Sequence, residues 1–137
     1  MRVAILGAGS LGLLVAGYLA RAGQTVIVVA KPDQADLLRK RGIEVVAPSG
    51  FRVEVQAASR PEEVGYADYL LVAVKARDTM QALERVAGVQ FGAVLSLQNG
   101  MAKNGQLAEV FGWPRVVGAA TILGATLLEP GRTQHTM

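Results

Sequence analysis

The fold is decided by the N-terminal stretch Val3-Ala4-Ile5-Leu6-Gly7-Ala8-Gly9-Ser10-Leu11-Gly12. Residues 2–6 form a short apolar run that ends at glycine, which is typical of a strand buried on both faces of a parallel sheet. From Leu11 the apolar residues follow helical spacing, and Gly23 stands where such a helix would end. Residues 25–30 form a second, β-branched run, so the segment predicts a βαβ unit.

The rest of the chain continues this alternation of strands and helices. We expect a helix at 32–41, a β-hairpin or meander at 43–55 around Pro48-Ser49-Gly50, a strand at 68–74, a helix at 78–86, a strand at 93–97 and a weaker helix ending near Gly112. The apolar run 116–128 predicts two further strands. This order predicts an α/β fold: a Rossmann-type, doubly wound and mostly parallel sheet in three α/β/α layers.

Length and composition restrict the classes of function. The chain has 137 residues, of which 51% are hydrophobic and 18% charged, as expected of one folded domain. A reductase with separate nucleotide and substrate domains needs about twice this length, at about 100–200 residues per domain. Basic residues are scattered and only 5% of residues are aromatic, which argues against nucleic-acid binding. The chain has no cysteine and only one histidine, which leaves few ligands for a metal site. The absence of cysteine favours a cytoplasmic protein.

One uncharged stretch has the length of a membrane span. Residues 3–20 carry no charged side chain, and about 18 such residues is the length at which a spanning helix is considered. The glycines at 7, 9 and 12 would break or weaken such a helix or a signal-peptide core. We therefore expect no membrane segment here.

The glycine pattern Gly7-Ala8-Gly9-Ser10-Leu11-Gly12 matches G-x-G-x-x-G between a predicted strand and a predicted helix. In this pattern the first glycine allows the tight turn, the second lets the backbone approach a pyrophosphate, and the third lets the helix pack close to the strand. The helix start then offers unpaired N–H groups and a partial positive charge to phosphates. A glycine-rich turn without a ligand is the alternative, and the strand–helix–strand context favours dinucleotide binding.

The residue after the second strand bears on the choice of cofactor. An acidic residue about 20 positions past the glycines would bind the ribose 2′-OH of NAD, but Lys31 stands there. A cation suits the 2′-phosphate of NADP, which a carboxylate would repel. Lys31 therefore favours NADP, although Asp33 lies close by and a solvated lysine is the alternative.

Ligands of open α/β sheets lie beyond the carboxyl ends of the strands. Lys75 follows the strand at 68–74, and Asn99 follows the strand at 93–97, so we expect both to converge on the edge that carries Lys31. Lys75 can reach a phosphate or ribose oxygen, and Asn99 offers a donor and an acceptor for a carboxamide or an alcohol. A solvated lysine and an Asn-Gly turn are the alternatives.

Two other polar residues are weaker candidates. Thr121 lies in an apolar run and is expected to be a buried strand residue, although it could line the cleft. His135 has no acidic partner at a readable spacing, so a structural or exposed histidine is expected.

Several of these segments together resemble the ketopantoate reductase (2-dehydropantoate 2-reductase) family. They are the glycine motif, Lys31, Val74-Lys75-Ala76, Leu97-Gln98-Asn99-Gly100, and residues 118–131 with Glu129-Pro130-Gly131. The resemblance covers only the N-terminal NADP-binding domain of that family. We therefore expect residues 1–137 to be an NADP-binding domain, without the family's helical C-terminal domain, and the chain to be cut rather than finished.

The resemblance implies roles for individual residues. Lys75 and Asn99 would line the nicotinamide end of the site, with Asn99 also facing the substrate, and Lys31, where the family commonly has arginine, would meet the 2′-phosphate. The implied reaction is hydride transfer from NADPH to 2-dehydropantoate, giving pantoate for pantothenate and coenzyme A synthesis. The family's proton-donating lysine and substrate-binding acid lie in the C-terminal domain, so we assign no catalytic residue and expect this fragment alone to be inactive.

Other functions remain open at this point. The glycine motif is shared with β-hydroxyacid and 6-phosphogluconate dehydrogenases and with other 2-keto acid reductases, although Gln98-Asn99-Gly100 favours ketopantoate reductase. A non-catalytic NAD(P)-sensing module is the alternative from another class, and a chain that naturally stopped at Met137 would support it. The expected partner is a small 2-keto acid, and a homodimer is a further candidate arrangement.

Overall fold

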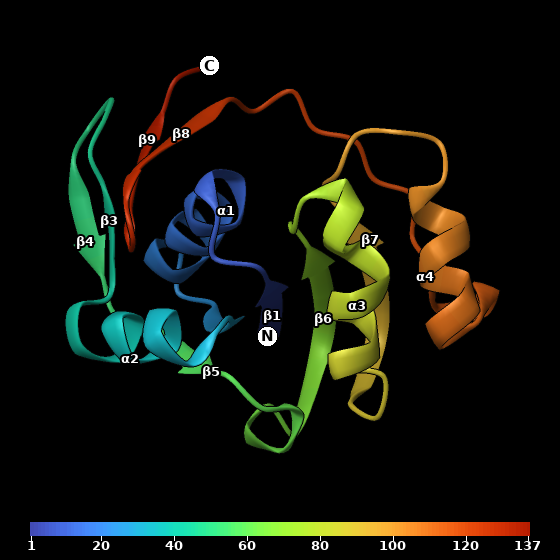
Figure 1. The fold of residues 1–137 in the computed structure, drawn as a ribbon. Helices are drawn as coiled ribbons and strands as arrows, with labels where there is room; N and C mark the ends of the chain where they lie inside the picture. The colour runs from blue at the N-terminus through green and yellow to red at the C-terminus, as the bar shows by residue number, and fades with distance from the viewer.

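The computed structural model describes residues 1–137 and is built on a five-stranded sheet in the order β5-β2-β1-β6-β7 (Figure 1). Every neighbouring pair in it is parallel. The strands are β1 (Arg2–Leu6), β2 (Thr25–Val29), β5 (Gln56–Ala58), β6 (Tyr66–Val72) and β7 (Gln90–Ser96). The predicted α/β class with a mostly parallel sheet is confirmed.

Two pairs of helices cover the two faces of this sheet. Helices α1 (Ser10–Arg21) and α2 (Pro32–Arg41) lie on one face, and α3 (Thr79–Arg85) and α4 (Lys103–Phe111) lie on the other (Figure 1). Each face has its own apolar core. Ile5, Leu14 and Leu38 are fully buried between the sheet and α1 and α2, whereas Leu83 and Leu107 are fully buried on the opposite face. The short apolar runs of the sequence are therefore strands buried on both sides.

A second, four-stranded sheet adds a layer that the sequence did not predict. Its strands are β3 (Ile43–Val45), β4 (Phe51–Val53), β8 (Ala125–Glu129) and β9 (Arg132–His135), in the order β4-β3-β9-β8. Strands β3 and β9 pair in parallel, and the other two pairs are antiparallel. The small sheet lies across α1 from β1 (Figure 1). A Cβ atom on Gly17 would lie 2.9 Å from Val45 Cγ2, so glycine allows α1 to approach β3 this closely.

The prediction of two strands within residues 116–128 is wrong. Only β8 forms there, at the end of the run, and its partner is the polar strand β9. Before β8 the segment makes a single bridge, between Val116 and Val94, and then runs exposed, with Ile122 90% accessible. An apolar run becomes a strand only where a neighbouring strand offers its hydrogen-bonding edge, and residues 118–123 cross the molecule without one.

Smaller corrections concern β5 and the strand boundaries. The three-residue strand β5 was not predicted, because such a short segment shows no readable period. Strand β6 ends at Val72 and not at residue 74, and β7 spans Gln90–Ser96 instead of 93–97. Val74 and Lys75 therefore lie in the loop between β6 and α3.

The order of the strands defines a switch point. From β1 the chain runs outward to β2 and β5, and then returns to the other side of β1 to form β6. Crevices that bind ligands in such sheets lie at the carboxyl ends of the strands where the order reverses. Here that place is the edge where β1 and β6 end. No helix in the structure combines the length and apolar character that a membrane crossing requires.

Candidate functional site

The carboxyl ends of β1, β6 and β7 bring three loops side by side. Backbone hydrogen bonds continue the sheet one residue past each strand end: Gly7 N–H donates to Val29 O at 3.0 Å, Ala73 N–H to Leu6 O at 2.9 Å, and Leu97 N–H to Val72 O at 2.9 Å. The turn after β1, the loop after β6 and the loop after β7 consequently leave the sheet next to one another.

The glycine-rich turn after β1 is closely packed at its first and third glycines. Gly7 has a φ of +114°, and a Cβ atom there would lie 3.0 Å from Val74 Cγ1. A Cβ atom on Gly12 would lie 2.5 Å from Gly7 O and 3.2 Å from Ala73 Cβ. Because neither residue has a side chain, α1 can lie close to β1 and to the loop after β6.

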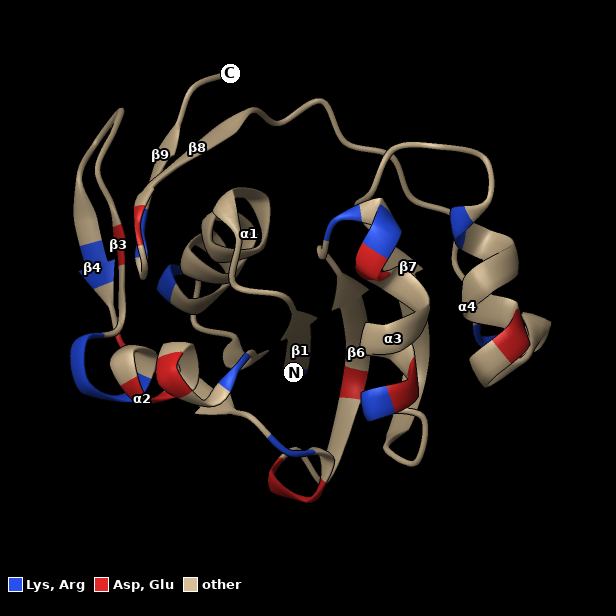
Figure 2. Ribbon diagram, in the orientation of Figure 1, with Lys and Arg blue, Asp and Glu red and all other residues tan.

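Gly9 has a different environment. A Cβ atom at this position would meet no atom within 4 Å, so nothing in the packing of the protein requires glycine there. Gly9 is the N-cap of α1 and provides no side-chain cap, and the first turn of the helix has no acidic residue. Figure 2 shows no charged residue along the first turns of α1. The open space lies where the unpaired N–H groups of the helix start and the positive end of its dipole are found. Ala8 and Ser10 flank Gly9, and Leu11 is the second residue of α1.

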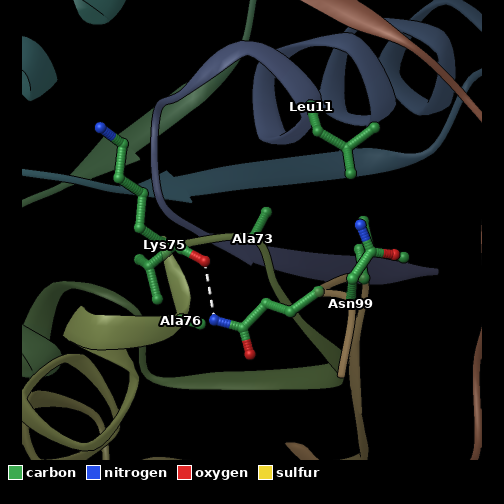
Figure 3. Close-up of a pocket in the computed structure, with 8 residues that line it drawn as sticks. Leu11, Ala73, Lys75, Ala76 and Asn99 are labelled. Atoms are coloured by element: carbon green, nitrogen blue, oxygen red, sulfur yellow. Dashed lines mark hydrogen bonds between the residues drawn. The ribbon is translucent and has the colours of Figure 1, made fainter. Parts of the chain in front are cut away.

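A hollow of about 340 Å³ opens between the start of α1 and the loops after β6 and β7. It is lined by Leu11, Ala73, Val74, Lys75, Ala76, Leu97, Gln98 and Asn99. In Figure 3 Leu11 lies above Ala73, and Lys75 and Asn99 lie on either side of it. The structure thus brings Lys75 and Asn99 to one hollow, beside the glycine-rich turn.

The polar ends of Lys75 and Asn99 are free. Both residues are exposed. No hydrogen bond or ion pair involves the Lys75 ammonium group or the Asn99 side-chain amide in this structure. An exposed cation and an amide with both donor and acceptor available are groups that a polar ligand in the hollow could bind.

Lys31 lies apart from that hollow. It is the N-cap residue of α2, exposed, just past the end of β2, and it does not line the hollow. Because β2 lies next to β1, Lys31 is on the opposite side of the glycine-rich turn from Lys75. All three predicted polar groups follow carboxyl ends of strands in the same parallel sheet, but only Lys75 and Asn99 line the hollow, and Lys31 lies apart from it beyond β2.

Gln98 has a role that the sequence did not reveal. Its Nε2 atom donates to Val74 O and to Thr79 Oγ1, both at 2.7 Å, and its Oε1 accepts from Ser96 Oγ at 2.9 Å. Figure 3 shows the bond to the loop after β6. Thr79 and Ser96 are each only 1% exposed. The sequence predicts a functional loop at Gln98-Asn99, but the positions of these residues in the sequence do not show which of the two side-chain amides faces the protein.

The two weaker candidates lie outside the hollow. Thr121 is half-buried in the irregular segment before β8, where its Oγ1 accepts from Leu123 N–H at 3.1 Å, so the expected buried strand position is wrong. His135 bonds to Tyr18 Oη through Nδ1 and to Met137 O through Nε2, both at 2.7 Å. It joins β9 to α1, which confirms a structural histidine.

The sheet order, the glycine-rich turn at its switch point and the hollow beside it define a Rossmann-type α/β domain. The chain belongs to the ketopantoate reductase family, since the family model described as ketopantoate reductase PanE/ApbA matches residues 3–137.

Relatives named 2-dehydropantoate 2-reductase support the same assignment. The protein from Archaeoglobus fulgidus is 39% identical over 134 residues, which cover 98% of this chain and 44% of the relative. The protein from Pyrococcus abyssi is 33% identical over 138 residues, covering 99% and 45%. The chain thus spans less than half the length of the curated relatives it matches.

Solved structures agree on the fold. A 2-dehydropantoate 2-reductase from Geobacter metallireducens superposes with a TM-score of 0.90 at 31% identity, covering 98% of this chain and 46% of that structure. A D-mandelate dehydrogenase with NADH and anilino(oxo)acetate also reaches 0.90, at 19% identity, covering 100% and 46%. At that identity the second likeness concerns the fold alone.

Proposed function

We propose that this chain is the NADPH-binding domain of a 2-dehydropantoate 2-reductase. The observation that carries the proposal is the open space over Gly9 at the N-terminus of α1, in a turn whose other two glycines are packed against protein. A pyrophosphate in this space would accept from the backbone N–H groups at the start of α1. Membership of the ketopantoate reductase family supports the same reading. Residues 7–12, with Ala8 and Ser10 beside Gly9, form the proposed phosphate cradle.

Lys31 supplies the proposed preference for NADPH over NADH. Its ammonium group has no carboxylate partner within the protein and lies beyond β2, on the side of the turn away from the hollow. The adenosine half of a dinucleotide laid across the turn would lie on this side, with its 2′-phosphate near Lys31. A point charge there lowers the free energy of binding a dianionic phosphate but does little for a ribose hydroxyl.

The hollow with Lys75 and Asn99 is the proposed site of the nicotinamide ring and of the keto acid. When bound, the nicotinamide supplies the hydride for reduction of a keto group. Leu11 and Ala73 would hold the ring against apolar surface, Asn99 would orient the carboxamide or the substrate oxygen, and Lys75 would attract the negative charge of phosphate or substrate. We assign no proton donor within residues 1–137. The chain is therefore proposed to bind NADPH without turnover, the reduction of 2-dehydropantoate requiring the remaining half of such a reductase.

Titration of the chain with NADPH and NADH, followed by nicotinamide fluorescence, tests the proposal. We expect NADPH to bind more tightly than NADH. We expect Lys31→Asp to weaken NADPH binding by at least about tenfold, or about 1.4 kcal/mol, and to leave the affinity for NADH nearly unchanged. Lys40→Asp is the matched control, because Lys40 is an exposed lysine at the other end of the same helix. Equal affinities for the two nucleotides, or equal losses in the two variants, would overturn the role of Lys31. Absence of binding to either nucleotide would overturn the proposed function.

A further inference from the structure

We propose that Gln98 is a positioning residue that holds Lys75 at its place beside the glycine-rich turn, without itself binding the ligand. The inference rests on the proposed function, since it concerns how the NADPH site is assembled. It follows from the hydrogen bonds of Gln98, from the burial of its partners and from the packing of Val74.

Each hydrogen of the Gln98 network can be assigned to one bond. A carbonyl oxygen only accepts, so the Gln98 atom at 2.7 Å from Val74 O is the amide nitrogen. Thr79 Oγ1 donates to Ala76 O at 2.8 Å, and its oxygen accepts the second amide hydrogen of Gln98. Ser96 Oγ donates to Gln98 Oε1 and accepts from the backbone N–H of Gln98 at 3.0 Å. The orientation of the amide is therefore fixed by its partners.

Saturation of this amide distinguishes Gln98 from its neighbour. Both N–H hydrogens of Gln98 are donated within the protein, so none remains for a ligand. The side chain of the adjacent Asn99 is exposed and makes no hydrogen bond within the protein. The side-chain amide of Gln98 is therefore bonded within the protein, whereas the side-chain amide of Asn99 can bind a ligand in the hollow.

The bonds of Gln98 fix the loop that carries Lys75. Val74 O and Thr79 Oγ1 lie on either side of Lys75 in the sequence, and Thr79 in turn holds Ala76 O. Val74 also packs against the turn after β1, because a Cβ atom on Gly7 would come within 3.0 Å of its Cγ1 atom. The loop is therefore held from β7 by Gln98 and from β1 by Gly7. Loss of the Gln98 bonds would release Val74 O and let Lys75 drift from the turn.

A double-mutant cycle on NADPH affinity tests this role. We expect Gln98→Ala and Lys75→Ala each to weaken NADPH binding about tenfold. In the Lys75→Ala background, we expect Gln98→Ala to weaken binding by less than about twofold further. Gln81→Ala is the matched control, because Gln81 is an exposed glutamine on α3. Val64→Ala, at a buried position away from the hollow, controls for lost stability. Additive losses from Gln98→Ala and Lys75→Ala, or an equal loss of affinity in Val64→Ala, would overturn the positioning role.

A second variant keeps the test decisive if Gln98→Ala does not fold. Gln98→Glu preserves the shape but replaces both donors by acceptors facing Val74 O and Thr79 Oγ1. We expect weak NADPH binding at neutral pH and partial recovery, relative to the parent chain, as the pH is lowered and the carboxyl gains a proton to donate. A constant ratio of the two affinities across pH contradicts the proposal. Failure of the parent chain to bind NADPH would instead overturn the proposed function, together with this inference.

Discussion

The two sheets of this domain differ in how they are stabilised. The main sheet is parallel, and strands such as β6 place residues like Leu70 fully inside the protein. The small sheet has strands of three to five residues, and on β8 Leu127 and Leu128 remain 40% and 43% exposed. It is attached to α1 through particular contacts, among them a hydrogen bond from Thr133 Oγ1 to Ser10 O at 2.9 Å.

The candidate site belongs to the first of these regions. Gly7, Lys75 and Asn99 follow β1, β6 and β7, all strands of the main sheet. The small sheet contributes none of the residues that line the hollow. The main sheet therefore carries the residues that line the hollow, whereas the small sheet covers α1 and adds the fully buried Ile43 and Val45 of β3 to the core on that face.

The largest expected difference between the two sheets concerns apolar burial. Leu70→Ala leaves a cavity between β6 and the helices, and we expect it to lower the free energy of unfolding by about 2–5 kcal/mol. Leu127→Ala, on the exposed strand β8, should change it by no more than about 0.5 kcal/mol. Urea denaturation of both variants measures the difference. Similar losses from the two substitutions would mean that β8 contributes as much to the core as β6 does.

A smaller effect is expected where the small sheet meets α1. Thr133→Val keeps the shape of a fully buried side chain but leaves Ser10 O without its hydroxyl donor, which should cost about 1 kcal/mol of unfolding free energy. Thr126→Val is the matched control, since Thr126 lies on the partner strand with an exposed side chain. Thermal unfolding gives the stability, and NADPH titration should show both variants binding within about twofold of the parent chain. A selective loss of affinity in Thr133→Val would extend the site to the small sheet.

The smallest effect concerns a carboxylate at the amino edge of the main sheet. The backbone N–H of Arg2 donates to Asp68 Oδ2 at 2.8 Å and lowers the pKa of that carboxyl, helped by the hydroxyl of Tyr66 at 3.2 Å. A lowered pKa in the folded state means that the carboxylate stabilises the fold above its unfolded pKa of about 3.9, and that this stability is lost as the pH falls through the folded value.

Asp68→Asn should therefore be less stable than the parent chain at neutral pH, and the difference should shrink in acid. Thermal unfolding across the acid range measures it, with Glu84→Gln, an exposed carboxylate on α3, as the control. A difference that stays constant with pH would show that the charge of Asp68 is not what stabilises this edge.

The same contrast explains what could be predicted from the sequence. Strands β1, β2, β6 and β7 were predicted because five to seven residues buried on both faces leave an apolar run. The hairpin at 43–55 was also predicted, but its parallel pairing with β9 joins Glu44 to Arg132, far along the chain, which no local pattern encodes. The prediction of two strands within residues 116–128 is wrong for the same reason, because a strand-like composition does not show whether a partner strand lies alongside.

The candidate site was predicted only in part, for a related reason. The rule that ligands lie at strand ends identified Lys75 and Asn99, and the structure places both at one hollow. The role of Gln98 depends on its side chain turning toward Val74 O and Thr79, which is decided by tertiary packing. The separation of Lys31 from the hollow follows from strand order, which the sequence did not specify.

The open space over Gly9 has a consequence for how substitutions would be tolerated. Its φ of −81° is open to any L-residue, and an added methyl group would touch nothing in the protein. Selection for thermal stability alone would reject side chains at Gly7 and Gly12 but leave position 9 free to vary. A library sorted by folding and then by nucleotide capture would therefore separate, within one six-residue turn, the glycines that build the domain from the one at which the proposed ligand would need open space.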